Sequence, residues 1–113
     1  MLSFPSSMRV FLYSQATDMR KSFDGLSGLV EEVIGKDPLS GHLFVFFNRR
    51  HTMVKMLMWD RSGFCIYSKR LEQGTFAFKN DFADYEIEIA ELFLILEGID
   101  LEQSRRRKRY RLP

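Results

Sequence analysis

The chain has 113 residues, which is the usual size of one domain and too short for two ordinary domains. Its composition, 45% hydrophobic and 28% charged, is close to the average of folded soluble proteins, and its longest apolar runs are far shorter than a membrane-spanning helix requires. The single cysteine, Cys65, excludes an intramolecular disulfide, and the net charge of +2 conceals a strongly basic C-terminal end.

The first elements predicted from the sequence are a strand over residues 9–13 and a helix that follows it. The strand is rich in aromatic and β-branched residues. Thr17 or Asp18 is suited to cap the helix, and Gly35 followed closely by Pro38 is a strong stop signal. Apolar residues at three-and-four spacing predict the helix face that packs on the core: Met19, Phe23, Leu26, Val30, Val33 and Ile34.

Three strands with short connections are predicted next. Residues 42–47 and 53–59 flank the polar loop 48–52, and a tight turn leads to a third strand over 64–68, with Gly63 suited to the left-handed position of the turn. Consecutive strands joined in this way form an antiparallel meander. Apolar side chains fall on both faces of the middle strand, so something covers each face. We expect two helices on one face and a partner, or a second copy, on the other.

The C-terminal part is predicted to contain a candidate strand over 75–78, a polar connection over 79–84 and a second helix over 87–96, ended by Gly98. The predicted fold class is therefore α+β: an antiparallel β-meander of about four or five strands with two helices packed mainly on one face. In this prediction, residues 1–104 form one domain and residues 105–113 form a disordered basic tail.

No residue pattern typical of an enzyme or a metal site is found. His42, His51 and Cys65 lack the spacings of metal ligands, and no glycine-flanked serine or glycine-rich phosphate loop occurs. We therefore predict no catalytic residue, no metal and no cofactor. A small metal-dependent nuclease built on carboxylates such as Asp60 and Glu72 stays open as an alternative, because only the geometry of a site tests it.

Basic residues are the stronger candidates for a site. They occur in pairs at three places of the predicted domain: the first turn of the first helix, the loop 48–52, and the segment that follows the strand 64–68. The free amides of a helix start favour anions, and a loop can reach a phosphate backbone. Ordinary solvated side chains are the alternative at each place. The pairs are Arg20 and Lys21, Arg49 and Arg50, and Lys69 and Arg70.

The basic tail is the most specific electrostatic feature. Six of the 17 basic residues and none of the 15 acidic residues lie in it, so residues 1–104 carry a net charge of −4 and the tail carries +6. A body and a tail of opposite charge indicate a nucleic-acid-contacting arm, and Tyr110 adds a ring that can stack on a base. A solubilising end, or contact with an acidic protein, is the alternative. The six residues are Arg105, Arg106, Arg107, Lys108, Arg109 and Arg111.

Several short segments follow one another in a characteristic order over residues 9–100. They begin with Ala16-Thr17-Asp18-Met19-Arg20-Lys21-Ser22-Phe23-Asp24-Gly25-Leu26, continue through Asp37-Pro38-Leu39-Ser40-Gly41, Asn48-Arg49-Arg50 and Lys69-Arg70-Leu71-Glu72-Gln73-Gly74-Thr75-Phe76, and end with Leu96-Glu97-Gly98-Ile99. In this order the segments resemble a bacterial transposable-element family, the TnpB-type, or Orf2-like, accessory protein of insertion sequence family sixty-six. The resemblance implies a small protein that is encoded beside a large transposase and helps the element to move, and it brings no catalytic residues.

The predicted function is that of a non-catalytic, cytoplasmic accessory protein for DNA transposition. DNA, bound non-specifically or at the ends of the element, and the transposase or another element-encoded protein are the expected partners. A homo-oligomer is compatible with the sequence, and no membrane contact is expected. A protein-only assembly adaptor, whose tail binds an acidic protein, is the second reading.

Overall fold

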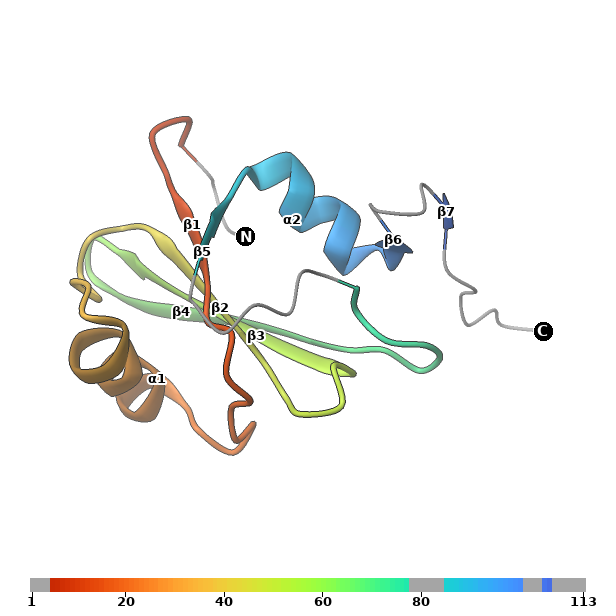
Figure 1. Ribbon diagram of the computed structural model, residues 1–113. Coiled ribbons are helices and arrows are strands. Elements are labelled where there is room, and N and C mark those ends of the chain that lie inside the picture. Colours follow the sequence, from red (N-terminus) through yellow and green to blue (C-terminus); the bar gives the residue numbers. More distant parts are fainter. Residues whose placement is uncertain (1–4, 78–84, 101–104, 107–113) are drawn as a thin grey trace.

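The computed structural model describes residues 5–77, 85–100 and 105–106, and its centre is a five-stranded sheet with the order β4-β3-β2-β1-β5 (Figure 1). The α+β class and the number of strands are confirmed. A separate two-stranded ribbon, β6 with β7, follows the second helix. The strands are β1 (Val10–Leu12), β2 (Leu43–Phe47), β3 (Met53–Asp60), β4 (Gly63–Arg70), β5 (Tyr85–Ile87), β6 (Ile99–Asp100) and β7 (Arg105–Arg106).

Only β2, β3 and β4 form the predicted antiparallel meander, because β1 runs parallel to β2. The helical segment between β1 and β2 provides the crossover that a parallel pair needs. Strand β5 pairs antiparallel with the other side of β1, so that Ile87 lies opposite Val10. The sheet is therefore mixed, and β1 is an inner strand although it is only three residues long.

The first helix begins later than the sequence predicts. Asp18 accepts the backbone N–H of Arg20 and holds a turn, so α1 (Phe23–Leu29) starts after Ser22. It continues as a π-helix, η1 (Val30–Ile34), and Gly35 ends it in the left-handed conformation with φ 77°, as predicted.

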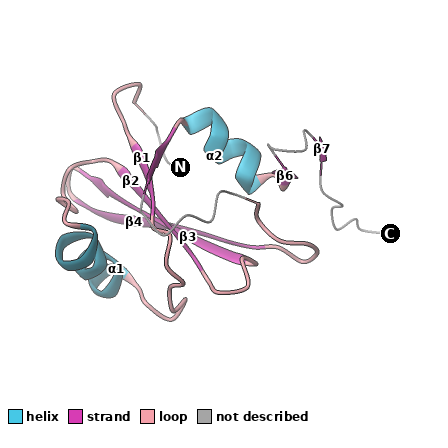
Figure 2. Ribbon diagram, in the orientation of Figure 1, coloured by secondary structure: helices cyan, strands magenta, loops and turns pink. Residues whose placement is uncertain are grey.

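The prediction that both helices pack mainly on one face of the sheet is wrong, since α1 and α2 (Ile89–Leu96) lie on opposite sides of it (Figure 2). Strand β3 explains the arrangement. Val54, Met56 and Met58 point to the α2 side, whereas Leu57 points to the α1 side, as alternation along a strand requires. Each apolar face is thus covered by one helix, and the expected partner or second copy is not needed to cover either face.

Two residues predicted to lie in the core are exposed: Phe23 to 46% and Val33 to 56%. Phe23 is the first residue of α1, and Val33 lies in the π-helical turn. A π-turn has more residues per turn than the 3.6-residue period used to predict the buried face, so Val33 is rotated away from the core while Ile34 still packs against it. Leu26 and Val30 are fully buried, as predicted.

The C-terminal part differs from the prediction in three ways. Phe76 lies in an irregular segment instead of a strand, although its ring is buried against Phe47. Strand β5 takes the start of the predicted second helix, which begins at Ile89 after a capping box in which Glu91 accepts the N–H of Glu88. In the β3–β4 turn, Arg61 adopts the left-handed conformation, with φ 53°, in place of Gly63.

The predicted connection 79–84 and most of the predicted tail lie outside the described residues. Arg105 and Arg106 are the described part of the tail, and they pair with β6. No helix in the described ranges 5–77, 85–100 and 105–106 is long and apolar enough to cross a membrane.

Candidate nucleic-acid interface

The loop between β2 and β3 is built around Asn48. Its side-chain Oδ1 accepts the backbone N–H groups of Thr52 at 2.9 Å and Met53 at 3.0 Å, and its Nδ2 donates to Thr52 Oγ1 at 3.0 Å. Asn48 also bonds through its backbone to Met53, at 3.2 Å. The half-buried side-chain amide of Asn48 thus provides hydrogen-bond partners for Thr52 and Met53, where β3 begins, and Asn48 itself follows the end of β2. These bonds give the loop a defined shape.

Replacing Asn48 by Ala is expected to lower the free energy of unfolding by about 1–3 kcal/mol, because two loop N–H groups lose their acceptor. Asn48→Asp keeps an acceptor oxygen for both and loses only the donor to Thr52, so a smaller change is expected. Chemical denaturation of the two variants beside the unsubstituted protein measures the difference. Equal stability of the Ala variant and the unsubstituted protein would contradict the role of Asn48.

His51 joins the loop to the segment that follows β4. Its backbone oxygen accepts the N–H of Phe76 at 2.8 Å, and its ring lies edge-on to Phe47, with the ring centroids 6.1 Å apart. Burial lowers the pKa of the His51 imidazole, so the ring is mainly neutral at neutral pH. His51 therefore anchors the loop and adds little to its charge.

Arg49 and Arg50 lie at the tip of this loop, and both are exposed. Neither has an ion-pair partner among the residues that the structure describes. A rigid loop that presents two adjacent guanidinium groups to solvent is suited to bidentate contacts with phosphate oxygens. Of the predicted candidates, this pair is the one whose geometry best fits phosphate contacts.

Arg20 and Lys21 lie near the same end of the sheet, although not in a helix as predicted. The backbone N–H of Thr17 donates to the oxygen of Phe47, the last residue of β2, at 2.9 Å, so the turn after β1 runs beside the loop. Arg20 forms an ion pair with Asp18 at 2.7 Å, and its hydrogen bonds lower the pKa of Asp18 to about 2. Asp18 therefore neutralises the charge of Arg20, whereas Lys21 has no ion-pair partner in the described part of the chain.

Lys55 was missed as a candidate and belongs to this end of the sheet. Its Nζ donates to the backbone oxygen of Lys21 at 2.7 Å, and in the sheet it lies opposite Phe46. The signal that could have found it is a single charged residue inside an otherwise apolar strand. Such a residue lies near a sheet end or has a polar partner, because an isolated charge in the core is costly.

Lys69 and Arg70 are the last two residues of β4 and lie at the same end of the sheet. Arg70 lies opposite Met53 at the start of β3, so the pair is next to the loop that carries Arg49 and Arg50. Lys69 donates from Nζ to the oxygen of Leu96 at 2.9 Å and stabilises the C-terminus of α2, and Arg70 forms an ion pair with Glu72 at 2.9 Å. Both residues add positive charge, but their side chains already have intramolecular partners.

The start of the basic tail is at this end too. Strand β6 follows the C-terminus of α2, which Lys69 holds, and Arg105–Arg106 pairs with it (Figure 1). We call this region the basic end. It consists of Arg20, Lys21, Arg49, Arg50, Lys55, Lys69, Arg70 and the backbone of Arg105–Arg106. Acidic residues also lie beside it: Asp18, Glu72, Glu97 at the end of α2, and Asp100, which is opposite Arg105 in the ribbon.

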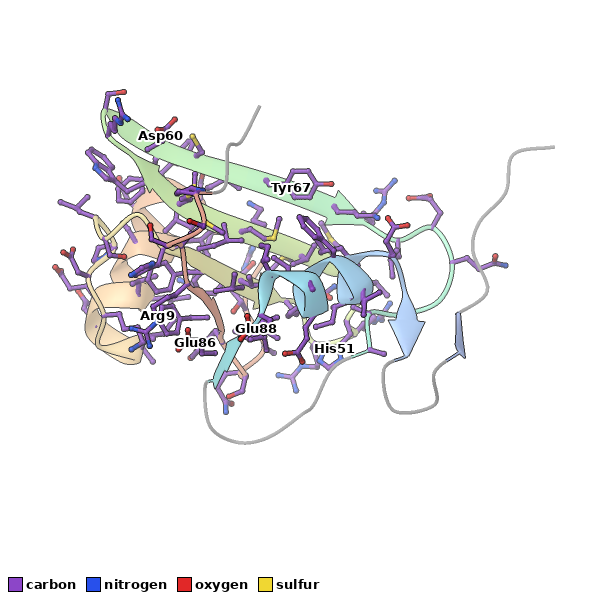
Figure 3. All side chains as sticks on the ribbon, turned by 90° about the horizontal axis from the view of Figure 1, so that it is seen from above. Arg9, His51, Asp60, Tyr67, Glu86 and Glu88 are labelled. Carbon is purple, nitrogen blue, oxygen red and sulfur yellow. The ribbon has the colours of Figure 1, made fainter. Side chains whose placement is uncertain are left out.

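The carboxylates named for a nuclease do not meet. Asp60 lies at the turn between β3 and β4, far from His51 and the basic end (Figure 3), whereas Glu72 follows the opposite end of β4. The eight residues of β4 separate them, which corresponds to roughly 27 Å. Within the described residues, no three His, Cys, Asp or Glu side chains are grouped so that they could hold a metal ion.

The fold and the basic end together define a small α+β protein in which several basic residues lie at one end of the sheet. A family model described as "IS66 Orf2 like protein" (TnpB_IS66) matches residues 8–106. The chain belongs to this family, which is associated with the transposition of insertion sequences.

Two curated relatives come from Sinorhizobium fredii (strain NBRC 101917 / NGR234). "Uncharacterized protein y4hO" is 37% identical over 101 residues, which cover 88% of each chain. "Uncharacterized protein y4jC" is 30% identical over 102 residues, which cover 88% of this chain and 86% of that protein. No solved structure matches the chain significantly. The similarity extends over nearly the whole length of both relatives and thus concerns the whole fold.

Proposed function

We propose that this protein is a non-catalytic accessory factor of transposition whose basic end holds DNA phosphates. The observation that carries the proposal is the position of Arg49 and Arg50, which are exposed on a rigid loop at the end of the sheet where the basic tail begins. In sequence, the tail adds four further basic residues after Arg106: Arg107, Lys108, Arg109 and Arg111. In this proposal residues 1–104 are the folded body and 105–113 the arm.

Contacts with phosphate set the affinity and its salt dependence, without reading the base sequence. Lys and Arg residues from several separate segments are suited to such contacts, since they need only follow the backbone of the duplex. The tail also contains Tyr110, whose ring can stack on a base that is unpaired, as at a strand break. We propose further that the body, which carries the net negative charge, docks on the transposase or on another protein of the element.

The proposal is tested by fluorescence anisotropy of a labelled DNA duplex across a salt series. Six phosphate contacts from the tail correspond to a slope of log affinity against log salt of about −5. A full-length variant in which Arg107, Lys108, Arg109 and Arg111 are replaced by Gln is expected to flatten the slope by about 4. The full length keeps β7 in place, so a change in slope reports charge and not the loss of a strand.

An unchanged slope in the Gln variant would exclude the tail from DNA binding. Absence of DNA binding by both proteins at low salt would favour the protein-only adaptor. In that case, an acidic polypeptide such as poly-Glu is expected to bind the unsubstituted protein and not the Gln variant.

A further inference from the structure

The outer edge of β4 is an open sheet edge of unusual length for this small sheet. Strand β4 pairs with β3 over all eight of its residues in one unbroken register, from Asp60↔Gly63 to Met53↔Arg70. No described residue pairs with its other side. Backbone groups alternate in direction along a strand, so about four residues of β4 direct their N–H and C=O groups away from β3.

Residues 63–68 of β4 contain none of the devices that normally protect such an edge, and the strand's two charged residues, Lys69 and Arg70, lie only at its C-terminal end. Protective devices include short strands, prolines, bulges and charged side chains. Residues 63–68 read Gly-Phe-Cys-Ile-Tyr-Ser, with no charge and no proline, and the register has no bulge. Tyr67 is 42% exposed, and Cys65 and Ile66 are half-buried, so the edge is apolar as well as unpaired. Figure 3 shows Tyr67 on β4, along the outer border of the sheet.

The opposite edge of the sheet, β5, is better protected against pairing with a further strand than β4 is. Strand β5 has three residues, and Glu86 at its centre is ion-paired to Arg9 at 2.6 Å. A charged, short edge does not accept a further strand readily. The contrast leaves β4 as the edge along which the sheet can be extended.

We infer that β4 is the interface of a homodimer in which two copies pair their β4 strands antiparallel and join their sheets into one. An edge strand that pairs with its own copy around a two-fold axis forms a closed, self-complementary interface. Charge decides the direction. Parallel pairing places Lys69 and Arg70 of both copies side by side. Antiparallel pairing with Tyr67 of each copy at the two-fold axis moves them to opposite ends, where Lys69 lies opposite Cys65 and Arg70 opposite Phe64 of the other copy.

Sedimentation equilibrium of the full-length protein, alone, over a hundredfold range of concentration tests the inference. The expected mass rises with concentration to twice the 13.4 kDa of one chain. In Tyr67→Lys, like charges face each other across the axis, so dimerisation is expected to weaken about tenfold. Two controls should remain dimeric: Tyr67→Thr, which removes the ring without adding charge, and Phe93→Lys, which places the same charge on the exposed side of α2.

Hydrogen exchange gives a second readout that does not depend on any variant. In the dimer, the outward N–H groups of residues 63–70 become protected, and their protection increases with protein concentration. A monomeric mass at every concentration overturns the inference. Protection that is present at monomer mass and independent of concentration also overturns it, because another segment of the same chain then covers the edge. Neither result depends on DNA, so the proposed function is tested separately.

Discussion

Replacing both Arg49 and Arg50 by Glu in the full-length protein is expected to weaken DNA binding by roughly ten- to a hundredfold at moderate salt. Two phosphate contacts are lost, which flattens the salt slope by about 2, and two carboxylates now face the phosphate backbone. The loop itself is expected to keep its shape. Its hydrogen bonds come from Asn48 and from backbone groups, and neither arginine side chain takes part in them.

A matched control exists at the opposite end of the sheet. Arg61 and Lys36 are exposed, and changing both to Glu alters the net charge by the same amount. Arg61 lies in the β3–β4 turn and Lys36 precedes β2, so both are remote from the basic end. Fluorescence anisotropy on one duplex should separate the two double variants clearly. Equal weakening by both would mean that net charge alone, and no particular surface, governs binding.

Replacing Phe44 by Ala is expected to lower the free energy of unfolding by about 3–5 kcal/mol. Phe44 is fully buried at the centre of the sheet, on the face that α1 covers, and its ring is stacked on Phe11 with the centroids 5.6 Å apart. The truncation removes apolar contacts and leaves a cavity between the sheet and the helix. Urea denaturation followed by circular dichroism measures the change.

Phe23→Ala is the informative comparison, because the helical period predicts Phe23 to be in the core and the structure exposes it to 46%. The same truncation at Phe23 is expected to cost less than about 1 kcal/mol. A large loss at Phe23, similar to that at Phe44, would show that the first helix presents the face predicted from its sequence. The two variants together therefore test the placement of α1.

Local signals in the sequence were sufficient for most of the strands and for the C-terminal ends of the two helices. The apolar runs predicted β2, β3 and β4 within about one or two residues at most ends, and Gly35 ended the first helix as expected. These features depend on residues close together in the chain, where backbone preferences act directly. The N-terminus of α1 was misplaced because Asp18 can cap a helix or hold a turn, and only its contact with Arg20 decides which.

The candidate site was predicted in part. Loop 48–52 was recognised from its polar composition, and the structure presents Arg49 and Arg50 to solvent there. The sequence could not show that Lys69 and Arg70 have intramolecular partners, because Glu72 and the carbonyl of Leu96 are brought to them by folding. It also could not identify Lys55 as part of the same end, since the contact with Lys21 spans 34 residues of the chain.

The sequence alone therefore determines the α+β class, the family, and the division of charge between an acidic body and a basic tail, since each of these is a property of composition or of local pattern. The tertiary structure decides which face each helix covers and which basic residues lie together. Both faces of β3 are apolar, so local pattern is compatible with either placement of the helices. The parallel pairing of β1 with β2, across the helical crossover, resolves it: α1 covers one face, α2 the other, and the turn after β1 lies beside the loop that carries Arg49 and Arg50.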